Sequence, residues 1–239
     1  YVYNVYNTYQ SQNNPFNKLD VLKINSSRTV HKTDIHNKIL INSIAKKIKL
    51  LFKLSNSNRN TNIEVLKNIF SRNNRITIVK LDIRKFFDNI PHDTLLDIIK
   101  KHRYLDSTDY HLIENYLDSS PISFGKGVHQ GTELSNMLAE LYFNVIDKKL
   151  RKLSQNLIFS ERYVDDILLI FNKVLSKEDI DFYYKKIKNE IEFYKLDLND
   201  RKTKIITIFT KKPFSSIINE GSTANHIPNV DSFKLYSLS

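Results

Sequence analysis

Apolar residues recur at helical spacing along much of the chain. The clearest case runs from Leu134 to Leu150, where one continuous apolar face is expected on a long helix. A second amphipathic segment, from Ile35 to Leu54, follows Asp34, which can cap a helix. Shorter patterns predict further helices at 63–70, 94–101, 110–117 and 178–194. The chain is therefore expected to contain several helices that each bury one face.

Runs of β-branched and aromatic residues predict strands between these helices. Residues 76–82 form an apolar run that ends in Asp82, which indicates a buried strand ending in a carboxylate. Further strands are predicted at 21–33 (two strands around an Asn-Ser-Ser turn), 205–209 and 233–238, with a strand or turn at 122–127. The polar stretches 1–20, 55–62 and 211–232 are expected to be irregular.

Two adjacent carboxylates interrupt the apolar run 162–171. Tyr163 and Val164 precede Asp165 and Asp166, and five apolar residues follow. An Asp pair is typical of a tight turn, so we expect a β-hairpin with both Asp side chains at its tip. Two close negative charges in apolar surroundings are unfavourable unless a cation neutralises them, which favours a divalent metal. A plain surface turn with solvated Asp side chains is the alternative.

Composition narrows the class of protein. The 239 residues carry a net charge of +11, which suits a polyanion such as nucleic acid, although a chain rich in Lys, Asn and Ile can also be basic merely for solubility. There is no Cys, which excludes disulfides and thiolate metal sites and fits a cytoplasmic location. No apolar run is long enough to span a bilayer, and no phosphate-binding Gly-rich motif is present. Because the first residue is Tyr, we expect a piece of a longer chain.

A third carboxylate extends the predicted metal site. Two-metal phosphoryl transfer requires carboxylates from different strands to converge on ions about 3.5–4 Å apart. Asp82 ends one predicted strand, and Asp165 and Asp166 tip another. Mg²⁺ is bound through one or two carboxylates together with substrate phosphates. The spacing is compatible with this chemistry but is not specific for it.

Four segments, taken together and in this order, resemble the motifs of reverse transcriptases, which are RNA-directed DNA polymerases. They are residues 81–90 (LDIRKFFDNI), 128–139 (VHQGTELSNMLA), 163–166 (YVDD) and 198–203 (LNDRKT). The resemblance covers about residues 20–210. His129 stands where Pro is usual, and Glu133-Leu134 replaces a pair common in group II intron and retron enzymes. The helix that follows is more similar to bacterial abortive-infection and defence-associated reverse transcriptases, a prokaryotic type.

The resemblance implies an α+β fold, a right-hand polymerase palm with a small fingers subdomain. Its sheet should be mostly antiparallel and backed by the helices at 134–150 and 178–194, and no segment resembles a thumb. The implied organisation is an irregular lead-in at 1–20, fingers at 21–75 and the palm at 76–210. The end of the palm, with a candidate primer-grip strand, would occupy 211–239.

The resemblance also implies a metal centre. Asp82, Asp165 and Asp166 match the catalytic carboxylates of the family, and the backbone carbonyl of Ile83 matches a minor metal ligand. The implied cofactor is a pair of Mg²⁺ ions, with Mn²⁺ as an alternative.

Nucleotide-binding roles are implied for five more residues. Phe87 matches the residue that crowds the sugar 2′ position and so favours deoxynucleotides, although plain core packing would also explain it. Gln130 and Gly131 would border the incoming base and the template. Arg28 resembles the fingers Arg that clamps the triphosphate, the alternative being an exposed hairpin charge. Lys202 would meet the pyrophosphate leaving group, unless it is a solvated turn residue.

The implied reaction is the addition of deoxynucleotides to a 3′-hydroxyl, with RNA as the expected template. The expected partners are an RNA or DNA template and primer, dNTPs, and a non-coding RNA or accessory domain, with no membrane. Two alternatives stay open at this point. One is template-independent or protein-primed DNA synthesis in antiphage defence, and the other is a non-catalytic palm module that only binds nucleic acid. Phe87 disfavours an RNA product.

Overall fold

The computed structural model describes residues 16, 20–25, 28–32, 35–54, 59–119, 125–209 and 232–236. The chain divides into two compact units that alternate along the sequence. Unit 1 comprises residues 1–55 and 85–145, and unit 2 comprises residues 56–84 and 146–239. The expected division into lead-in, fingers and palm stays a prediction, and most of the lead-in lies outside the described residues.

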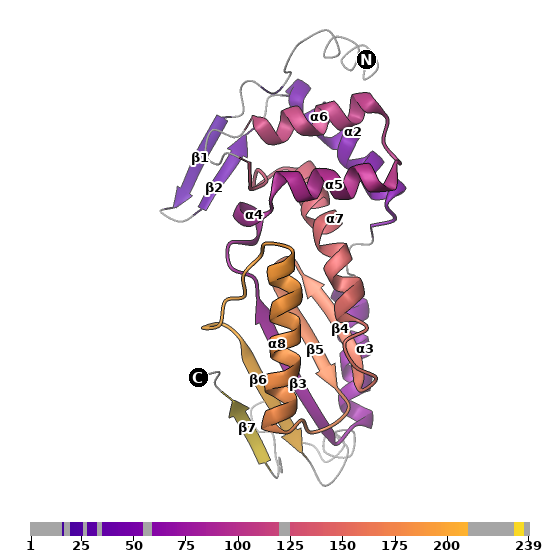
Figure 1. The fold of residues 1–239 in the computed structure, drawn as a ribbon, viewed down its shortest axis with the longest axis vertical. Coiled ribbons are helices and arrows are strands. Elements are labelled where there is room, and N and C mark those ends of the chain that lie inside the picture. Colours follow the sequence, from indigo (N-terminus) through magenta and orange to yellow (C-terminus); the bar gives the residue numbers. More distant parts are fainter. Residues whose placement is uncertain are drawn as a thin grey trace. The chain divides into compact units, whose positions relative to one another are not determined.

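Unit 2 is built on a five-stranded antiparallel sheet (Figure 1). The spatial order is β4-β5-β3-β6-β7. The strands are β3 (Arg75–Asp82), β4 (Leu157–Tyr163), β5 (Asp166–Phe171), β6 (Lys204–Phe209) and β7 (Ser232–Tyr236). The strands predicted at 76–82, 205–209 and near 233–238 are therefore confirmed, as is the mostly antiparallel sheet.

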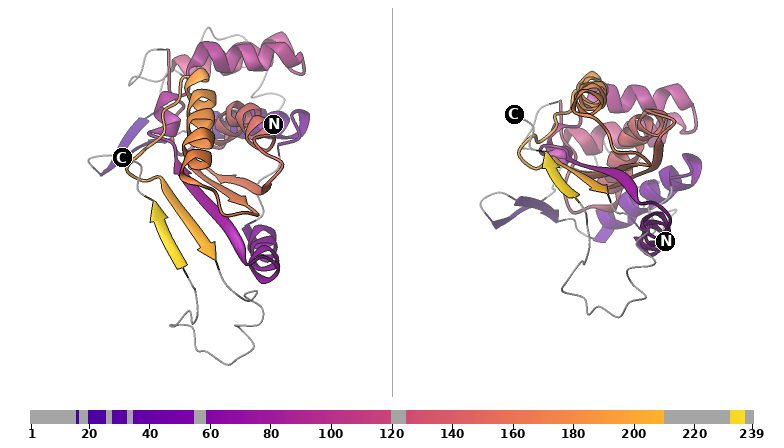
Figure 2. Two further views of the ribbon diagram at one scale, coloured as in Figure 1. Left: turned by 60° about the horizontal axis from the view of Figure 1, so that its bottom comes forward. Right: turned by 90° about the horizontal axis from the view of Figure 1, so that it is seen from below.

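Helices cover both faces of this sheet. Successive side chains of a strand point to opposite faces, so apolar side chains lie on both of them. Helix α8 (Lys177–Phe193) covers one face, where the ring of Tyr183 lies 5.1 Å from that of Phe171. Helix α3 (Arg59–Arg72) packs on the other, where Ile76 and Ile170 are buried in a cluster with Phe159. Figure 2 shows the two helices on opposite sides of the strands. The central strands β3 and β5 are consequently held between two apolar layers.

Unit 1 is mainly helical. Strands β1 (Asp20–Asn25) and β2 (Arg28–Lys32) form an antiparallel hairpin. The helices are α2 (Ile35–Leu51), α4 (Phe86–Asn89), α5 (His92–His102), α6 (Ser107–Asp118) and α7 (Glu133–Leu150), the last of which continues into unit 2. Tyr116, Phe143 and Ile44 are among the largest fully buried side chains of this unit. The predicted hairpin at 21–33 and the predicted long helix are confirmed.

Several predicted boundaries were wrong. Helix α2 ends at Leu51 rather than Leu54, and Lys53 adopts a left-handed conformation with φ 51°. Helix α3 begins at Arg59, so the predicted loop at 55–62 includes helical residues. The polar Asn-rich start of α3 concealed it, because the apolar face begins only at Ile63. Residues 211–231 and residues 122–124 of the predicted segment 122–127 lie outside the described part, whereas Lys126 forms an isolated bridge with Pro91.

Among the described residues, no helix is both long and apolar enough to cross a membrane.

Candidate active site

A tight hairpin connects β4 and β5 at the end of the sheet. Tyr163 pairs with Asp166 across the hairpin, so the turn consists of Val164 and Asp165. Val164 has φ 58°, an unfavourable conformation for a β-branched residue that costs about 1–3 kcal/mol. The prediction of a hairpin is confirmed, but only Asp165 lies in the turn. Asp166 is the first residue of β5 and is fixed by the sheet.

A buried arginine holds this strained turn. Arg162 is only 8% exposed, and its guanidinium donates to the backbone carbonyl of Val164 at 2.9 Å. The same guanidinium donates twice to the Asp147 carboxylate of α7, at 3.2 Å each. A buried charge is tolerated when it is paired and hydrogen-bonded in this way. Sequence reasoning missed Asp147, whose only signal was an acidic residue on the apolar helix before the hairpin.

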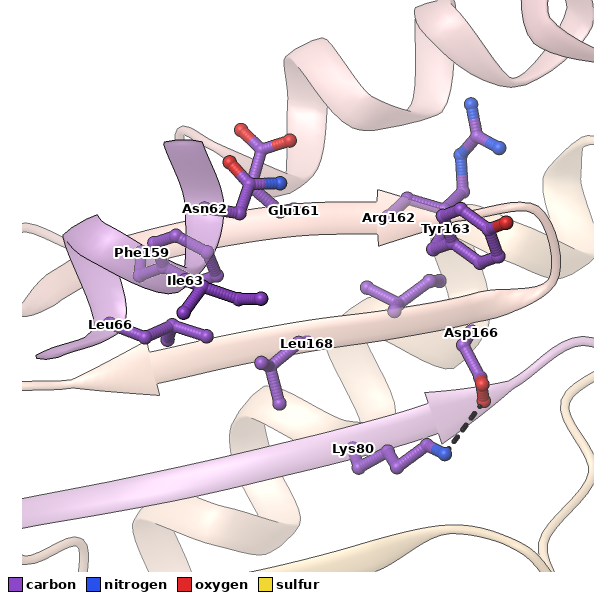
Figure 3. A pocket seen from close by; sticks show the side chains of 11 residues that line it. Asn62, Ile63, Leu66, Lys80, Phe159, Glu161, Arg162, Tyr163, Asp166 and Leu168 are labelled. Carbon is purple, nitrogen blue, oxygen red and sulfur yellow. Dashed lines mark ion pairs between the residues drawn. The ribbon is translucent and has the colours of Figure 1, made fainter. Parts of the chain in front are cut away.

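The carboxylates of two strands meet at the edge of the sheet. Asp82 of β3 is the register partner of Asp166 of β5. Asp82 is buried, and the Nζ of Lys202 lies 3.0 Å from its Oδ2. Asp166 is half-exposed and pairs with the Nζ of Lys80 at 3.0 Å (Figure 3). Each member of the cross-strand pair is therefore neutralised by a lysine, as two adjacent carboxylates require.

Lys202 responds to this negative charge. Its hydrogen bond to Asp82 raises its pKa above the ordinary value, and the attraction of Asp82, Asp165 and Asp166 adds to the effect. Backbone contacts hold its turn against the end of β3, because the Asn199 N–H donates to the Asp82 carbonyl at 2.8 Å and the Lys202 N–H donates to the Asn199 carbonyl at 2.9 Å. Lys202 thus pairs with a carboxylate at the end of β3, and its role at the pyrophosphate stays a prediction.

The residue after Asp82 ties the two strand ends together. The Ile83 N–H donates to the backbone carbonyl of Asp165 at 2.9 Å, and the Arg84 N–H donates to the Asp197 carbonyl at 2.8 Å. Ile83 is itself buried. The turn that carries Asp165 is therefore fixed to the segment that follows Asp82 by backbone bonds, independently of side-chain identity.

A cavity of about 440 Å³ opens beside Asp166 on the face of the sheet that carries α3. Figure 3 shows the Lys80–Asp166 ion pair at one end of it and the apolar side chains of α3 and β4 at the other. Tyr163 is 64% exposed at its border. The apolar part of the lining consists of Ile63, Leu66, Phe159, Ile167 and Leu168. The cavity beside Asp166 therefore has a largely apolar wall.

The donor chemistry at this edge fits a hard divalent cation. Carboxylate and carbonyl oxygens are the ligands that Mg²⁺ prefers, and Asp82, Asp166 and Asp165 supply them from two strand ends. The contacts of Lys80 and Lys202 show that this edge attracts positive charge. Among the described residues, no three His, Cys, Asp or Glu side chains form a group that could hold a metal ion. The convergence of all three carboxylates stays a prediction.

The predicted sugar-gate segment lies in unit 1. Phe86 is buried, with its ring 5.5 Å from that of Phe143, whereas Phe87 is half-buried. The carbonyl of Phe87 accepts the Val128 N–H at 2.8 Å, so the segment is bonded to the chain just before Gln130. Phe86 is thus a core residue and Phe87 a partly exposed one, and the role of Phe87 as a sugar gate stays a prediction.

Gln130 and Gly131 lie in the turn that precedes α7 and face the same segment. The Gln130 Nε2 donates to the Asp88 carboxylate at 3.0 Å, and Gly131 has φ 101°, which favours glycine. Sequence reasoning missed Asp88 as the partner of Gln130. Arg28 is the first residue of β2, and its predicted role stays a prediction.

A buried polar network supports this turn from behind. The hydroxyl of Tyr116 bonds the Thr132 hydroxyl and lies 2.8 Å from the Ser135 hydroxyl. The ring of His129 lies 4.6 Å from that of Tyr116, and its Nε2 is 3.0 Å from the Ser119 hydroxyl. Residues on both sides of Gln130 and Gly131 are therefore anchored in the core of unit 1.

The network predicts a pH dependence of stability. Burial raises the pKa of Tyr116 to about 12, while an unfolded tyrosine ionises near 10. The unfolded state therefore releases a proton first, so stability should fall as pH rises from about 10 toward 12, by up to about 2–3 kcal/mol. Urea unfolding of wild type and Tyr116→Phe across this range should show a shallower slope for the variant. Equal slopes would contradict the assignment of this loss to Tyr116.

The fold of this chain is similar to the folds of solved polymerases. The fold resembles the telomerase of Candida tropicalis in complex with a TWJ fragment of telomeric RNA, with TM-score 0.57, 14% identity, and coverage of 86% of this chain and 44% of that one. It also resembles the BmCPV RNA-dependent RNA polymerase in its quiescent state, with TM-score 0.54, 10% identity, and coverage of 84% and 21%. At these identities the likeness shows the fold alone, an α+β palm. The chain spans less than half the length of these structures.

A comparison of the sequence with models of protein families identifies its family. The family model described as reverse transcriptase (RNA-dependent DNA polymerase) matches residues 18–234. The chain therefore belongs to the reverse transcriptase family. Among curated proteins, none matches this sequence.

Proposed function

We propose that this protein is an RNA-directed DNA polymerase that adds deoxynucleotides to the 3′-hydroxyl of a primer. The observation that carries the proposal is the cross-strand pair of Asp82 and Asp166 with Asp165 on the adjoining turn. A protein that only bound nucleic acid would gain nothing from carboxylates gathered at one sheet edge, because they repel phosphates. Membership of the reverse transcriptase family supports the same chemistry.

Divalent cations would be held by the carboxylates of Asp82, Asp165 and Asp166 and by the carbonyl of Ile83. When bound, two Mg²⁺ ions lower the pKa of the attacking hydroxyl and stabilise charge on the phosphate oxygens. The chain's own residues prepare the site: Arg162 fixes the hairpin turn, and the Ile83 N–H holds the Asp165 backbone. Lys80 and Lys202 supply the countercharge to the cross-strand pair, and Lys202 would meet the leaving pyrophosphate.

The unit 1 residues would select the nucleotide. Phe87 would crowd the sugar 2′ position, and Gln130 and Gly131 would border the incoming base and template. The Gln130–Asp88 hydrogen bond and the Phe87–Val128 backbone bond support a joint role for the two segments, because they join one segment to the other. Arg28 would clamp the triphosphate.

We further propose a prokaryotic, defence-associated or retron-like role in the cytoplasm, with a non-coding RNA or accessory domain as partner. The sequence of α7 supports this placement, since its residues 138–147 are similar to those of bacterial defence enzymes.

Primer extension with the purified protein tests the function. Reactions should compare RNA, DNA and no template, dNTPs with NTPs, and Mg²⁺ with Mn²⁺. Elongation with dNTPs on an RNA template, with a product of complementary sequence, is expected. Products of unrelated sequence without template would favour untemplated synthesis, and no product under any condition would favour a binding module.

Binding of primer–template should depend steeply on salt. With a net charge of +11, the protein should release counterions from every phosphate it neutralises, about 0.9 per contact on duplex DNA. Fluorescence anisotropy across a series of salt concentrations measures this slope. An affinity that stays constant across the series would contradict an electrostatic interface.

A further inference from the structure

Three aromatic rings gather where α2 and α5 end, within unit 1. Phe52 follows the last residue of α2, His102 is the last residue of α5, and Tyr104 lies two residues beyond it. The Phe52 ring lies 5.3 Å from each of the other two, and His102 stacks on Tyr104 at 5.5 Å with an interplanar angle of 28°. Tyr104 is 52% exposed, and His102 is also exposed. We call these three residues the ring cluster.

Basic residues flank the ring cluster in the sequence. Lys53 follows the end of α2 by two residues, and Arg103 directly follows α5. Both are exposed and both have φ 51°. Lys101, in the last turn of α5, is also exposed. Lys49 lies in the last turn of α2.

Nearby acidic groups compensate little of this charge. Asp106 and Asp109 are both paired with Lys47, and among the described residues no ion pair joins Lys53, Lys101 or Arg103 to a carboxylate. Cations at helix C-termini complement the helix dipole, but that does not explain exposed stacked rings beside them.

We propose that the ring cluster is a binding site for single-stranded nucleic acid, on which an unpaired base stacks while the flanking cations neutralise phosphates. Base–aromatic stacking and a basic surface are together the means by which proteins hold single strands. The face of Tyr104 offers the stacking surface, and Phe52 and His102 fix its orientation. Lys53, Lys101 and Arg103 carry the charge complementary to a backbone. A duplex fits less well, because its bases are already stacked.

This site is distinct from the proposed site of chemistry. None of the residues proposed for metal or nucleotide binding belongs to the ring cluster, and binding there requires no nucleotide addition. A protein inactive in primer extension would still bind a single strand at this site, so the two proposals fail separately.

The test compares two fluorescent single strands of equal length, one of normal nucleotides and one of abasic backbone. Tyr104→Ala should weaken binding of the normal strand about 5- to 30-fold and leave the abasic strand unchanged. Tyr104→Phe keeps the ring and should bind like wild type. Phe193→Ala is the matched control, because Phe193 is 74% exposed with the Lys149 Nζ 5.1 Å from its ring, but lies on α8 in unit 2. Thermal melting of each variant checks the fold.

A second measurement locates the contact directly. A strand carrying iodouracil should cross-link to Tyr104 or His102 on irradiation, as mapped by mass spectrometry.

The salt dependence of binding tests the flanking cations. The double variant Lys53→Gln, Arg103→Gln should reduce the slope of log affinity against log salt concentration by about 1.4, because two phosphate contacts are lost. Lys185→Gln, Lys186→Gln, which changes two exposed lysines of α8, should leave this slope unchanged. Equal affinity of Tyr104→Ala and wild type for the normal strand, or equal losses on both strands, would overturn the proposal.

Discussion

Asp165→Asn is expected to abolish nucleotide addition while the protein remains folded. The substitution preserves the shape of the side chain but removes a negative charge that would hold a divalent cation. The loss of a charged ligand should remove several kcal/mol of charge stabilisation. With a tenfold change per about 1.4 kcal/mol, the rate should fall about 10³-fold or more. Primer extension under single-turnover conditions with Mg²⁺ measures it.

The fold should survive because the backbone holds this turn. The Ile83 N–H bonds the Asp165 backbone carbonyl, and Arg162 bonds the neighbouring carbonyl of Val164, so neither contact depends on the Asp165 carboxylate. Asp181→Asn is the matched control, since it makes the same charge change on an exposed position of α8. It should keep full activity. Substantial Mg²⁺-dependent activity in Asp165→Asn would remove Asp165 from the metal site.

Phe87→Ala is expected to relax the choice of sugar. Phe87 follows Asp82 by five residues and is half-buried on α4, so part of its ring can meet a nucleotide. A 2′-hydroxyl pressed against a packed ring is absorbed poorly. A clash of about 2–3 kcal/mol corresponds to roughly 30- to 150-fold discrimination. The ratio of kcat/KM for dNTP over rNTP should therefore fall by about that factor, chiefly because ribonucleotide incorporation rises.

Phe86→Ala provides the contrast. Phe86 is buried against Phe143, so its loss should destabilise the protein by about 3–5 kcal/mol without changing the sugar ratio. Chemical denaturation measures the first effect and primer extension the second. If Phe86→Ala changes the ratio and Phe87→Ala does not, the gate is the other residue of the pair. If neither changes it, there is no steric gate here, and the proposal of a DNA product loses its best local support.

Spacing was sufficient to predict the elements that bury one continuous face. The apolar face from Leu134 to Leu150 and the apolar run within 76–82 are local patterns that tertiary contacts reinforce. Where polar residues begin a helix, as in α3, the same reasoning placed its start four residues too late. The two-unit arrangement was not predictable, because the chain leaves unit 1 at residue 55 and returns at residue 85. Local patterns carry no information on such long-range clustering.

For the site, the residue pattern was enough to identify the carboxylates and their order: Asp82 at a strand end, and Asp165 and Asp166 between two apolar runs. The folded chain was needed to show that Asp82 and Asp166 are register partners and that Lys80 and Lys202 neutralise them. It was also needed to show that Phe86 is buried and Phe87 half-buried. It alone revealed the Arg162–Asp147 support beneath the turn. The reason is physical: strand identity follows from local side-chain chemistry, whereas cross-strand register and buried ion pairs join residues far apart in the chain, whose proximity exists only after folding.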